Sequence, residues 1–169
     1  MSNIILIGMP GSGKSTLGVL LAKALGYSFT DTDLIISRRA GKPLQRILDE
    51  DGLQHFLSLE EQVGSTLECD HTVVATGGSM VLSKAAMEHL HQMGRVVYIN
   101  VSLAEIERRV TNIKTRGIAF RKNETLCDVY RERKPLYEQY ADITVDVSAA
   151  NNIEETVDSL VNKTDISIC

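Results

Sequence analysis

The chain has 169 residues, of which 43% are apolar, and it carries a net charge of −4. This size predicts one compact domain with one sizeable core, and the negative charge gives no support to a nucleic-acid partner. The three cysteines lie far apart without a C-x-x-C pair, which argues against disulfides and a zinc site and is typical of a reducing, cytoplasmic setting. The apolar run at residues 3–7 is one strand long, so we expect neither a secretion signal nor a membrane span.

A glycine-rich loop at residues 8–16 follows this run directly and fits the phosphate-loop pattern G-x-x-x-x-G-K-S/T. Small residues let successive backbone N–H groups point inward at an anion, and side chains at Gly11 or Gly13 would block that approach. Lys14 then reaches the β- and γ-phosphates and Ser15 binds magnesium, beside the positive end of the next helix. The expected nucleotide-binding residues of this loop are Gly11, Ser12, Gly13, Lys14, Ser15 and Thr16.

The segment after the loop decides between this interpretation and a glycine-rich turn that binds nothing. Apolar residues recur there at helical spacing, and Gly26 stands where such a helix would end. They are Leu17, Leu20, Leu21, Ala24 and Leu25. Because strand, loop and amphipathic helix follow one another without a gap, the sequence predicts binding of a nucleoside triphosphate.

The whole chain alternates strand-like and helix-like segments. The expected strands cover residues 4–7, 28–30, 73–76, 95–100 and 143–147. Helical patterns cover residues 53–67, a segment that starts at Ser102 with a capping box to Glu105, and a last segment from about Ile153. This order predicts an α/β fold in three α/β/α layers, with a five-stranded parallel sheet that binds ligands at the C-terminal ends of its strands. We expect one domain over residues 1–163 and a loosely held tail over residues 164–169.

Two short segments follow expected strands at that edge of the sheet. Asp31 and Asp33 suit a metal-linked acid and a substrate-binding acid, and both point the same way if the strand continues. Equally, Thr32 or Asp33 caps the next helix. Gly77 and Gly78 form either a simple turn or a place where bare backbone lets a ligand come close.

Two clusters of cations come later in the chain. Residues 108–118 carry several arginines and lysines and a glycine, as a phosphate-closing lid at about residues 111–124 would, or as a solvated basic loop does. Residues 130–137 place a second group of cations late in a helix. That group either holds an anionic substrate or complements the negative end of the helix.

These motifs occur in the order found in shikimate kinases, and the chain resembles that family over nearly its whole length. The resemblance implies a phosphate-loop fold of the nucleoside-monophosphate-kinase type with a mobile lid. It implies that Asp31 helps to organise magnesium and that Asp33 binds the acceptor hydroxyls, while Gly77 and Gly78 match the glycines of the family's Thr-Gly-Gly-Gly turn. The adenine-stacking, lid and carboxylate-binding arginines of the family fall on Arg109, Arg116 and Arg133.

The chain departs from the family pattern at three positions, which lie on the substrate side or in the lid. In the segment that matches G-x-x-x-F-R-x-x-E, residues 52–60, Leu57 replaces an arginine that shares the substrate carboxylate. Leu57 lies at the flank of an apolar stripe and can fill space there, and Lys42 is a candidate replacement cation. Ser79 replaces the third glycine of the turn, and Gly117 follows the lid arginine in place of a proline, which predicts a more flexible hinge.

Together these features predict an ATP- and Mg²⁺-dependent kinase that acts on a small hydroxylated acceptor, with shikimate as the leading candidate. Its expected catalytic residues are Lys14, Asp33 and Arg116, and its expected metal ligands are Ser15 and Asp31. The alternatives are a related kinase for another hydroxy acid, polyol or nucleoside, and a nucleotide-binding pseudoenzyme that signals to a partner. We expect the chain to act as a monomer, without nucleic acid or membrane.

Overall fold

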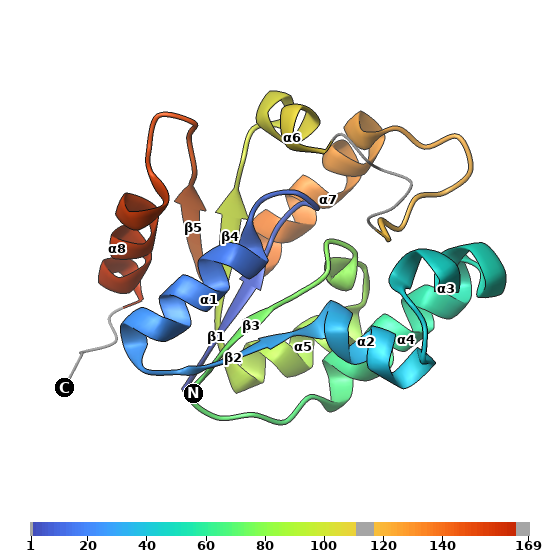
Figure 1. Cartoon of the computed structure of the whole chain (residues 1–169), viewed down its shortest axis with the longest axis horizontal. Helices are drawn as coiled ribbons and strands as arrows, with labels where there is room; N and C mark the ends of the chain where they lie inside the picture. The colour runs from blue at the N-terminus through green and yellow to red at the C-terminus, as the bar shows by residue number, and fades with distance from the viewer. Residues whose placement is uncertain (1, 111–116, 165–169) are drawn as a thin grey trace.

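The computed structural model of the chain describes residues 2–110 and 117–164, and strands and helices alternate along it (Figure 1). The strands are β1 (Asn3–Ile7), β2 (Ser28–Asp31), β3 (Thr72–Ala75), β4 (Gly94–Asn100) and β5 (Ile143–Asp146). The helices are α1 (Lys14–Leu25), α2 (Thr32–Ala40), α3 (Leu44–Asp51), α4 (Leu53–Thr66), α5 (Lys84–Met93), α6 (Leu103–Arg109), α7 (Leu126–Tyr140) and α8 (Ile153–Lys163), with a 3₁₀ turn, η1 (Met80–Leu82). All five predicted strands are confirmed, each end within one residue of its predicted place.

The strands form one parallel sheet in the order β2-β3-β1-β4-β5. Central strand β1 is buried along its whole length, as its unbroken apolar sequence requires of a strand covered on both faces. Because all strands run the same way, the loops after β1, β2 and β3 emerge at the same edge. The predicted ligand-binding edge therefore gathers the phosphate loop, the aspartates and the glycine turn.

Helices cover both faces of the sheet, which confirms the predicted three layers (Figure 1). Helices α1 and α8 pack together on one face, while α5 and α7 contact strand β4 from the other. The main core lies between these layers and includes most of β1, β3 and β4. None of the helices in the described part of the chain is long and apolar enough to cross a bilayer.

Helix α1 begins directly at the phosphate loop. Gly13, the residue before it, has φ 86°, and Gly26 ends it with φ 69° and an N–H that points back to the last turn. Both backbone conformations favour glycine over any residue with a side chain. The prediction that this helix ends at Gly26 is confirmed.

Helices α2, α3 and α4 form a lobe beside the sheet with its own small apolar cluster (Figure 1). Its buried members are Ile36, Ile47, Phe56, Val63 and Ala119, and Leu57 packs against them. Ala119 lies in the segment that leads from residue 117 to α7. The cluster therefore packs this later segment of the chain against the lobe.

Two predicted caps differ in the structure. Ser102 accepts a hydrogen bond from the Glu105 N–H, but the Glu105 carboxylate binds Arg108 and Arg109 rather than returning to the cap, so the reciprocal capping box is wrong. The cap of α2 is Asp31, whose side chain accepts from the Asp33 N–H, and not Thr32 or Asp33. Since the strand ends at Asp31, Asp33 lies in the first helical turn instead of continuing the strand.

Candidate active site

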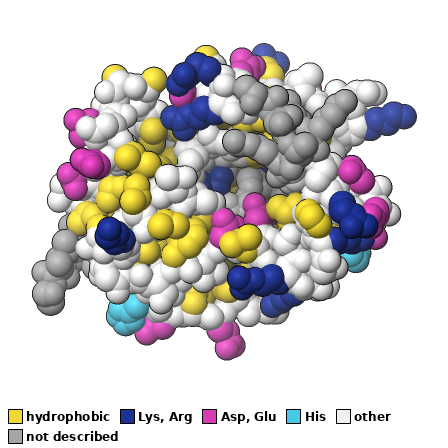
Figure 2. Space-filling view, viewed as in Figure 1, with side chains coloured by type: hydrophobic (Ala, Val, Ile, Leu, Met, Phe, Trp, Pro, Cys, Tyr) yellow, Lys and Arg dark blue, Asp and Glu magenta, His cyan; other side chains and the backbone are white. Residues whose placement is uncertain are grey.

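A cavity of about 550 Å³ opens at the C-terminal edge of the sheet. Figure 2 shows basic and acidic side chains around a hollow near the centre of this face of the molecule. The cavity is lined by most of the predicted site residues: Gly11, Gly13, Lys14, Ser15, Thr16, Asp33, Gly77, Gly78, Arg109 and Arg133. Predicted residues from five separate parts of the chain thus meet in one place. Arg116, the predicted lid arginine, lies outside the described residues.

Lys14 lies at the floor of the phosphate loop and is 7% exposed. Its Nζ donates hydrogen bonds to the carbonyl oxygens of Gly8 (2.9 Å) and Met9 (2.8 Å) and to Ser12 Oγ (3.3 Å). Burial lowers the pKa of Lys14 to about 8, against the opposing effect of the nearby Asp33 and Asp31 carboxylates. The loop therefore holds a desolvated ammonium where an anionic phosphate would be its strongest partner.

Ser15 and Asp31 form the pair predicted to hold magnesium. Ser15 Oγ donates to Asp31 Oδ2 at 2.7 Å, so the end of β2 and the start of α1 bring the two side chains into contact. A hydroxyl and a carboxylate supply oxygen ligands of the kind that Mg²⁺ prefers, with phosphates and water completing its shell. No group of three or more His, Cys, Asp and Glu side chains that could hold a metal occurs within residues 2–110 and 117–164. The Ser15 hydroxyl and the Asp31 carboxylate remain two oxygen ligands that fit Mg²⁺.

Asp33 faces the same cavity from the first turn of α2. Burial raises the pKa of its carboxyl to about 6, and the neighbouring Asp31 adds to this effect while Lys14 opposes it. A carboxylate with this pKa is ionised near neutral pH and retains enough basicity to take a proton from a hydroxyl. Asp33 therefore lies in the cavity with a pKa that suits a general base for an alcohol.

The glycine turn after β3 forms another wall. A side chain at Gly77 would come within 2.5 Å of Glu60 Oε2 and 2.7 Å of Asp33 Oδ1, and one at Gly78 would meet the ring of Pro10 at 2.6 Å. Gly78 also offers its carbonyl oxygen to the Tyr137 hydroxyl at 2.6 Å. A side chain at Gly78 would clash with the rigid ring of Pro10 in the phosphate loop, and one at Gly77 would displace the Glu60 and Asp33 carboxylates.

Arg109, at the end of α6, lies against the phosphate loop. Its Nη1 donates to the Ser12 carbonyl oxygen at 3.4 Å, and its Nε donates to Glu105 Oε1 at 2.7 Å. The Glu105 carboxylate also binds Arg108, and these two guanidinium groups lower the pKa of Glu105 to about 2. The Glu105 side chain, which is 11% exposed, holds Arg109 against the phosphate loop, where its flat guanidinium can stack on a base.

Arg133 also lines the cavity and is only 2% exposed. Its Nη2 donates to the Ala119 carbonyl oxygen at 2.7 Å, while Nε and Nη1 have no hydrogen-bond partner among the described residues. Buried charged donors without partners are unfavourable, so this guanidinium is a ready site for an anion that accepts two hydrogen bonds.

The segment that follows residue 116 is tied to the lobe and to α7. Gly117 has φ 65°, and a side chain there would overlap Leu44 Cβ of α3. Its N–H donates to Gln45 Oε1 at 3.3 Å. Proline allows neither this φ nor this donor, so the departure from the family's proline matches the local backbone. The Gly117 position is therefore a packed contact with α3.

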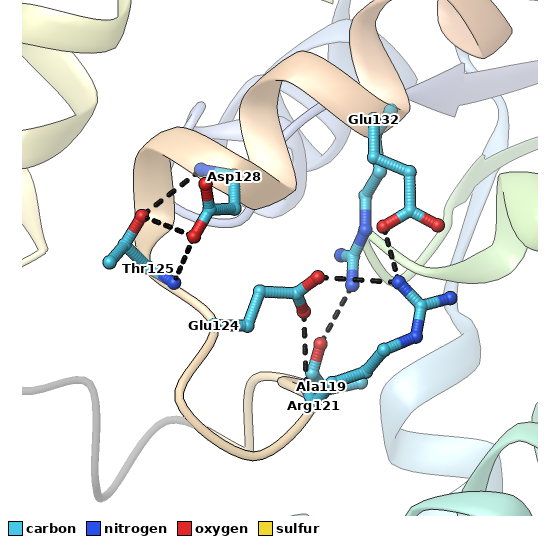
Figure 3. A network of polar contacts seen from close by, with 7 residues as sticks. Ala119, Arg121, Glu124, Thr125, Asp128 and Glu132 are labelled. Atoms are coloured by element: carbon cyan, nitrogen blue, oxygen red, sulfur yellow. Dashed lines mark hydrogen bonds and ion pairs between the residues drawn. The ribbon is translucent and has the colours of Figure 1, made fainter.

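A network of polar contacts holds the next part of the segment (Figure 3). Arg121 binds Glu124 and, at 2.6 Å, Glu132 of α7. Thr125 and Asp128 cap α7 reciprocally. Figure 3 shows Ala119 beside Arg121, so the contacts of Arg121 with Glu124 and Glu132 hold the segment whose carbonyl oxygen accepts from Arg133.

The departures noted in the sequence fall in different places. Leu57 does not line the cavity; it packs against the small apolar cluster, which confirms that it fills space. Lys42 is not the replacement cation, because its Nζ pairs with Glu50 and Asp51 at 2.9 and 2.5 Å. Ser79, by contrast, lies in the cavity wall.

Glu60 is a cavity residue that sequence analysis left out of the site. It is 1% exposed, and its Oε1 accepts a hydrogen bond from Ser79 Oγ at 2.5 Å. Burial raises the pKa of Glu60 to about 7, although the Ser79 hydroxyl opposes this. The signal was present, since a glutamate on the apolar stripe of a helix that begins at Leu53 calls for a partner or a function.

The phosphate loop with Lys14 and Ser15, the Asp33 carboxylate and the Arg109 and Arg133 guanidinium groups line one cavity, and Asp31 contacts Ser15 at its margin. This set of groups matches the needs of phosphoryl transfer from a nucleotide to an alcohol. The fold and the site together define a phosphate-loop kinase of small molecules.

Comparisons with known proteins give the family. The shikimate kinase family profile matches residues 10–165. A shikimate kinase from Thermosynechococcus vestitus is 37% identical over 95% of this chain and 88% of its own length, and one from Actinobacillus pleuropneumoniae serotype 5b is 38% identical over 94% and 96%. The solved shikimate kinase from Acinetobacter baumannii in complex with shikimate superposes with a TM-score of 0.88 at 29% identity, covering 100% of this chain and 96% of that one. The chain belongs to the shikimate kinase family, whose members are ATP-dependent phosphotransferases acting on an alcohol group.

Proposed function

We propose that this chain transfers the γ-phosphoryl group of ATP to a hydroxyl of shikimate, with Mg²⁺ bound at Ser15 and Asp31. The observation that carries this proposal is the buried guanidinium of Arg133, with two unpartnered donors, in the same cavity as Asp33 and the phosphate loop. This arrangement suits an acceptor that carries a carboxylate and neighbouring hydroxyls, because Arg133 can bind the carboxylate and Asp33 the hydroxyls. Its similarity to a shikimate kinase solved in complex with shikimate supports the same acceptor.

On the nucleotide side, backbone N–H groups of residues 11–16 and the Lys14 ammonium hold the phosphates and stabilise charge on the transferred group. Ser15 and Asp31 would hold Mg²⁺, which would supply positive charge to neutralise part of the charge on the phosphates. Arg109 stacks on the adenine, held by Glu105. Arg116 is proposed, by resemblance, to close over the γ-phosphate.

On the acceptor side, Asp33 orients the hydroxyl that attacks and takes its proton. With a pKa of about 6, the carboxyl is ionised and able to act at neutral pH, and it loses this ability as the pH falls below 6. Arg133 Nε and Nη1 bind the acceptor carboxylate, while the Ala119 carbonyl oxygen holds the guanidinium in place.

The test is ADP release with ATP and Mg²⁺, comparing shikimate with quinate, gluconate, simple polyols and no acceptor. We expect turnover with shikimate well above the others, and its loss in Lys14→Ala. Turnover with a polyol that lacks a carboxylate, at the same rate as with shikimate, would contradict the role of Arg133. ATP binding without turnover of any acceptor would indicate a nucleotide-binding pseudoenzyme instead.

We also infer that the enzyme works as a monomer in the cytoplasm. The residues that bind nucleotide, metal and acceptor in this proposal all come from one chain, and Cys69 and Cys127 are free thiols, as suits a reducing compartment. Light scattering at the concentration used for the assay tests the monomer.

A further inference from the structure

The Glu60 carboxyl is buried in the wall of the acceptor cavity and is only half satisfied. Its Oε1 accepts from Ser79 Oγ at 2.5 Å, while its Oε2 has no hydrogen-bond partner in the described part of the chain. A Cβ placed on Gly77 would lie 2.5 Å from that Oε2 and 2.7 Å from Asp33 Oδ1. The free oxygen of Glu60 therefore faces the same point above Gly77 as the proposed general base.

Ser79 is the single described donor to this carboxyl. The side chain is 4% exposed and makes no capping bond to η1, so its hydroxyl is committed to Glu60. A glycine at this position, as in the family pattern, has no hydroxyl to donate. The hydrogen bond therefore exists only because of the departure at residue 79.

Position 57 lies one helical turn before Glu60 on α4. Residues three apart on a helix are neighbours, so an arginine at 57, as in the family pattern, starts beside the Glu60 carboxyl and can donate to it. Leu57 has no donor and packs into the apolar cluster of the lobe. The chain thus has no cation at position 57 to pair with Glu60. At position 79 it supplies a neutral partner, the Ser79 hydroxyl.

The replacement of a cation at position 57 by a neutral hydroxyl at position 79 makes the cavity less positive. Lys14 and Arg109 contact the phosphate loop, which leaves Arg133 as the cation that the described residues place at the acceptor end, against the carboxyls of Asp33 and Glu60. The raised pKa of Glu60, caused by burial, agrees with a carboxyl that is held by a neutral hydroxyl.

We propose that Leu57, Glu60 and Ser79 act as one unit that sets acceptor specificity: the Ser79 hydroxyl fixes the Glu60 carboxyl in place of a cation at position 57, and Glu60 Oε2 then binds an acceptor hydroxyl. The proposal rests on the proposed function and deepens it. Its consequence is an enzyme that depends on acceptor hydroxyls more, and on the charge of the acceptor carboxylate less, than one with an arginine at 57.

The experiment is a double-mutant cycle on the full chain with Leu57→Arg, Ser79→Gly and the double variant. For each protein, kcat/KM is measured with shikimate and with its uncharged methyl ester, and the free energy of unfolding is measured in urea. We expect Ser79→Gly alone to lower kcat/KM for both acceptors about tenfold, because Glu60 loses its donor. Leu57→Arg should restore kcat/KM for shikimate in the Ser79→Gly background. In the wild-type background it should change kcat/KM for shikimate little. In both variants that carry it, Leu57→Arg should raise the preference for shikimate over the ester about tenfold.

Leu59→Arg is the matched control, because Leu59 is a half-buried leucine on the same helix, packs against the same cluster and does not line the cavity. It should lower stability and leave the acceptor preference unchanged. An equal effect of Leu57→Arg on kcat/KM for shikimate in both backgrounds, or an acceptor preference that Leu57→Arg leaves unchanged, would overturn the proposal. If the wild-type protein does not turn over shikimate, the proposed function fails. The coupling within the unit is then tested by the free energies of unfolding in urea. Effects of the two substitutions at positions 57 and 79 that do not add support the unit, and effects that add refute it.

Discussion

Replacing the buried Glu60 by glutamine should stabilise the protein at high pH and not at low pH. The amide keeps the size of the carboxyl and its acceptor oxygen for Ser79, and it removes the charge. In the folded protein the pKa of Glu60 is raised by burial from its ordinary value of 4.5 to about 7. A raised pKa of an acid means that folding favours the protonated form, so Glu60 reduces stability as the pH rises from about 4.5 to 7, and the loss is complete above that range.

The magnitude follows from the two pKa values. Each pH unit between them is worth about 1.4 kcal/mol, so the full interval corresponds to a loss of about 3 kcal/mol. Because the side chain is 1% exposed, solvent screening removes little of this. We therefore expect Glu60→Gln to increase the free energy of unfolding by about 3 kcal/mol more at pH 8 than at pH 4.5.

The assay is urea unfolding followed by circular dichroism at both pH values, without nucleotide or acceptor. Glu61→Gln makes the same chemical change at the next position, which is exposed, and serves as the control. A gain from Glu60→Gln that is the same at both pH values, or a loss that grows with pH, would show that the Glu60 carboxylate is stabilised by its surroundings and that its burial does not control its charge.

Three other predictions concern the site and the segment that leads to α7. Arg133→Lys keeps the charge but loses the planar donors, so the KM for shikimate should rise about 10- to 100-fold with the KM for ATP unchanged; equal changes in both would contradict an acceptor role. Gly117→Ala should lower the free energy of unfolding more than Gly26→Ala does. At both positions an alanine would be held at positive φ, which costs about 1–2 kcal/mol. Only at Gly117 does the new Cβ also overlap a neighbour, Leu44. Asp31→Asn should raise the Mg²⁺ concentration needed for half-maximal turnover, measured by titration after treatment with a chelator, and an unchanged requirement would place the metal elsewhere.

The sequence by itself determined the nucleotide half of the site. The phosphate loop lies within nine successive residues between a strand and a helix, so its geometry follows from local backbone rules at Gly11 and Gly13, whose φ values are 80° and 86°. The five strands were equally predictable, because each is a short segment rich in β-branched or aromatic residues. The contact of Asp31 with Ser15 also needs the order of the strands in the sheet, which comes from the tertiary structure.

The tertiary structure alone decided the acceptor half. Whether Asp33 continues β2 or lies in the first turn of α2 depends on where the strand ends, and the sequence was compatible with both. Leu57 and Glu60 lie one turn apart on α4, yet one packs in the apolar cluster of the lobe and the other lines the cavity. Their separation is set by how α4 is rotated against its neighbours, and that rotation depends on contacts among segments far apart in the chain. The partnership of Glu60 with Ser79, 19 positions away, is of the same kind, because a hydrogen bond between side chains of different elements exists only after those elements have packed.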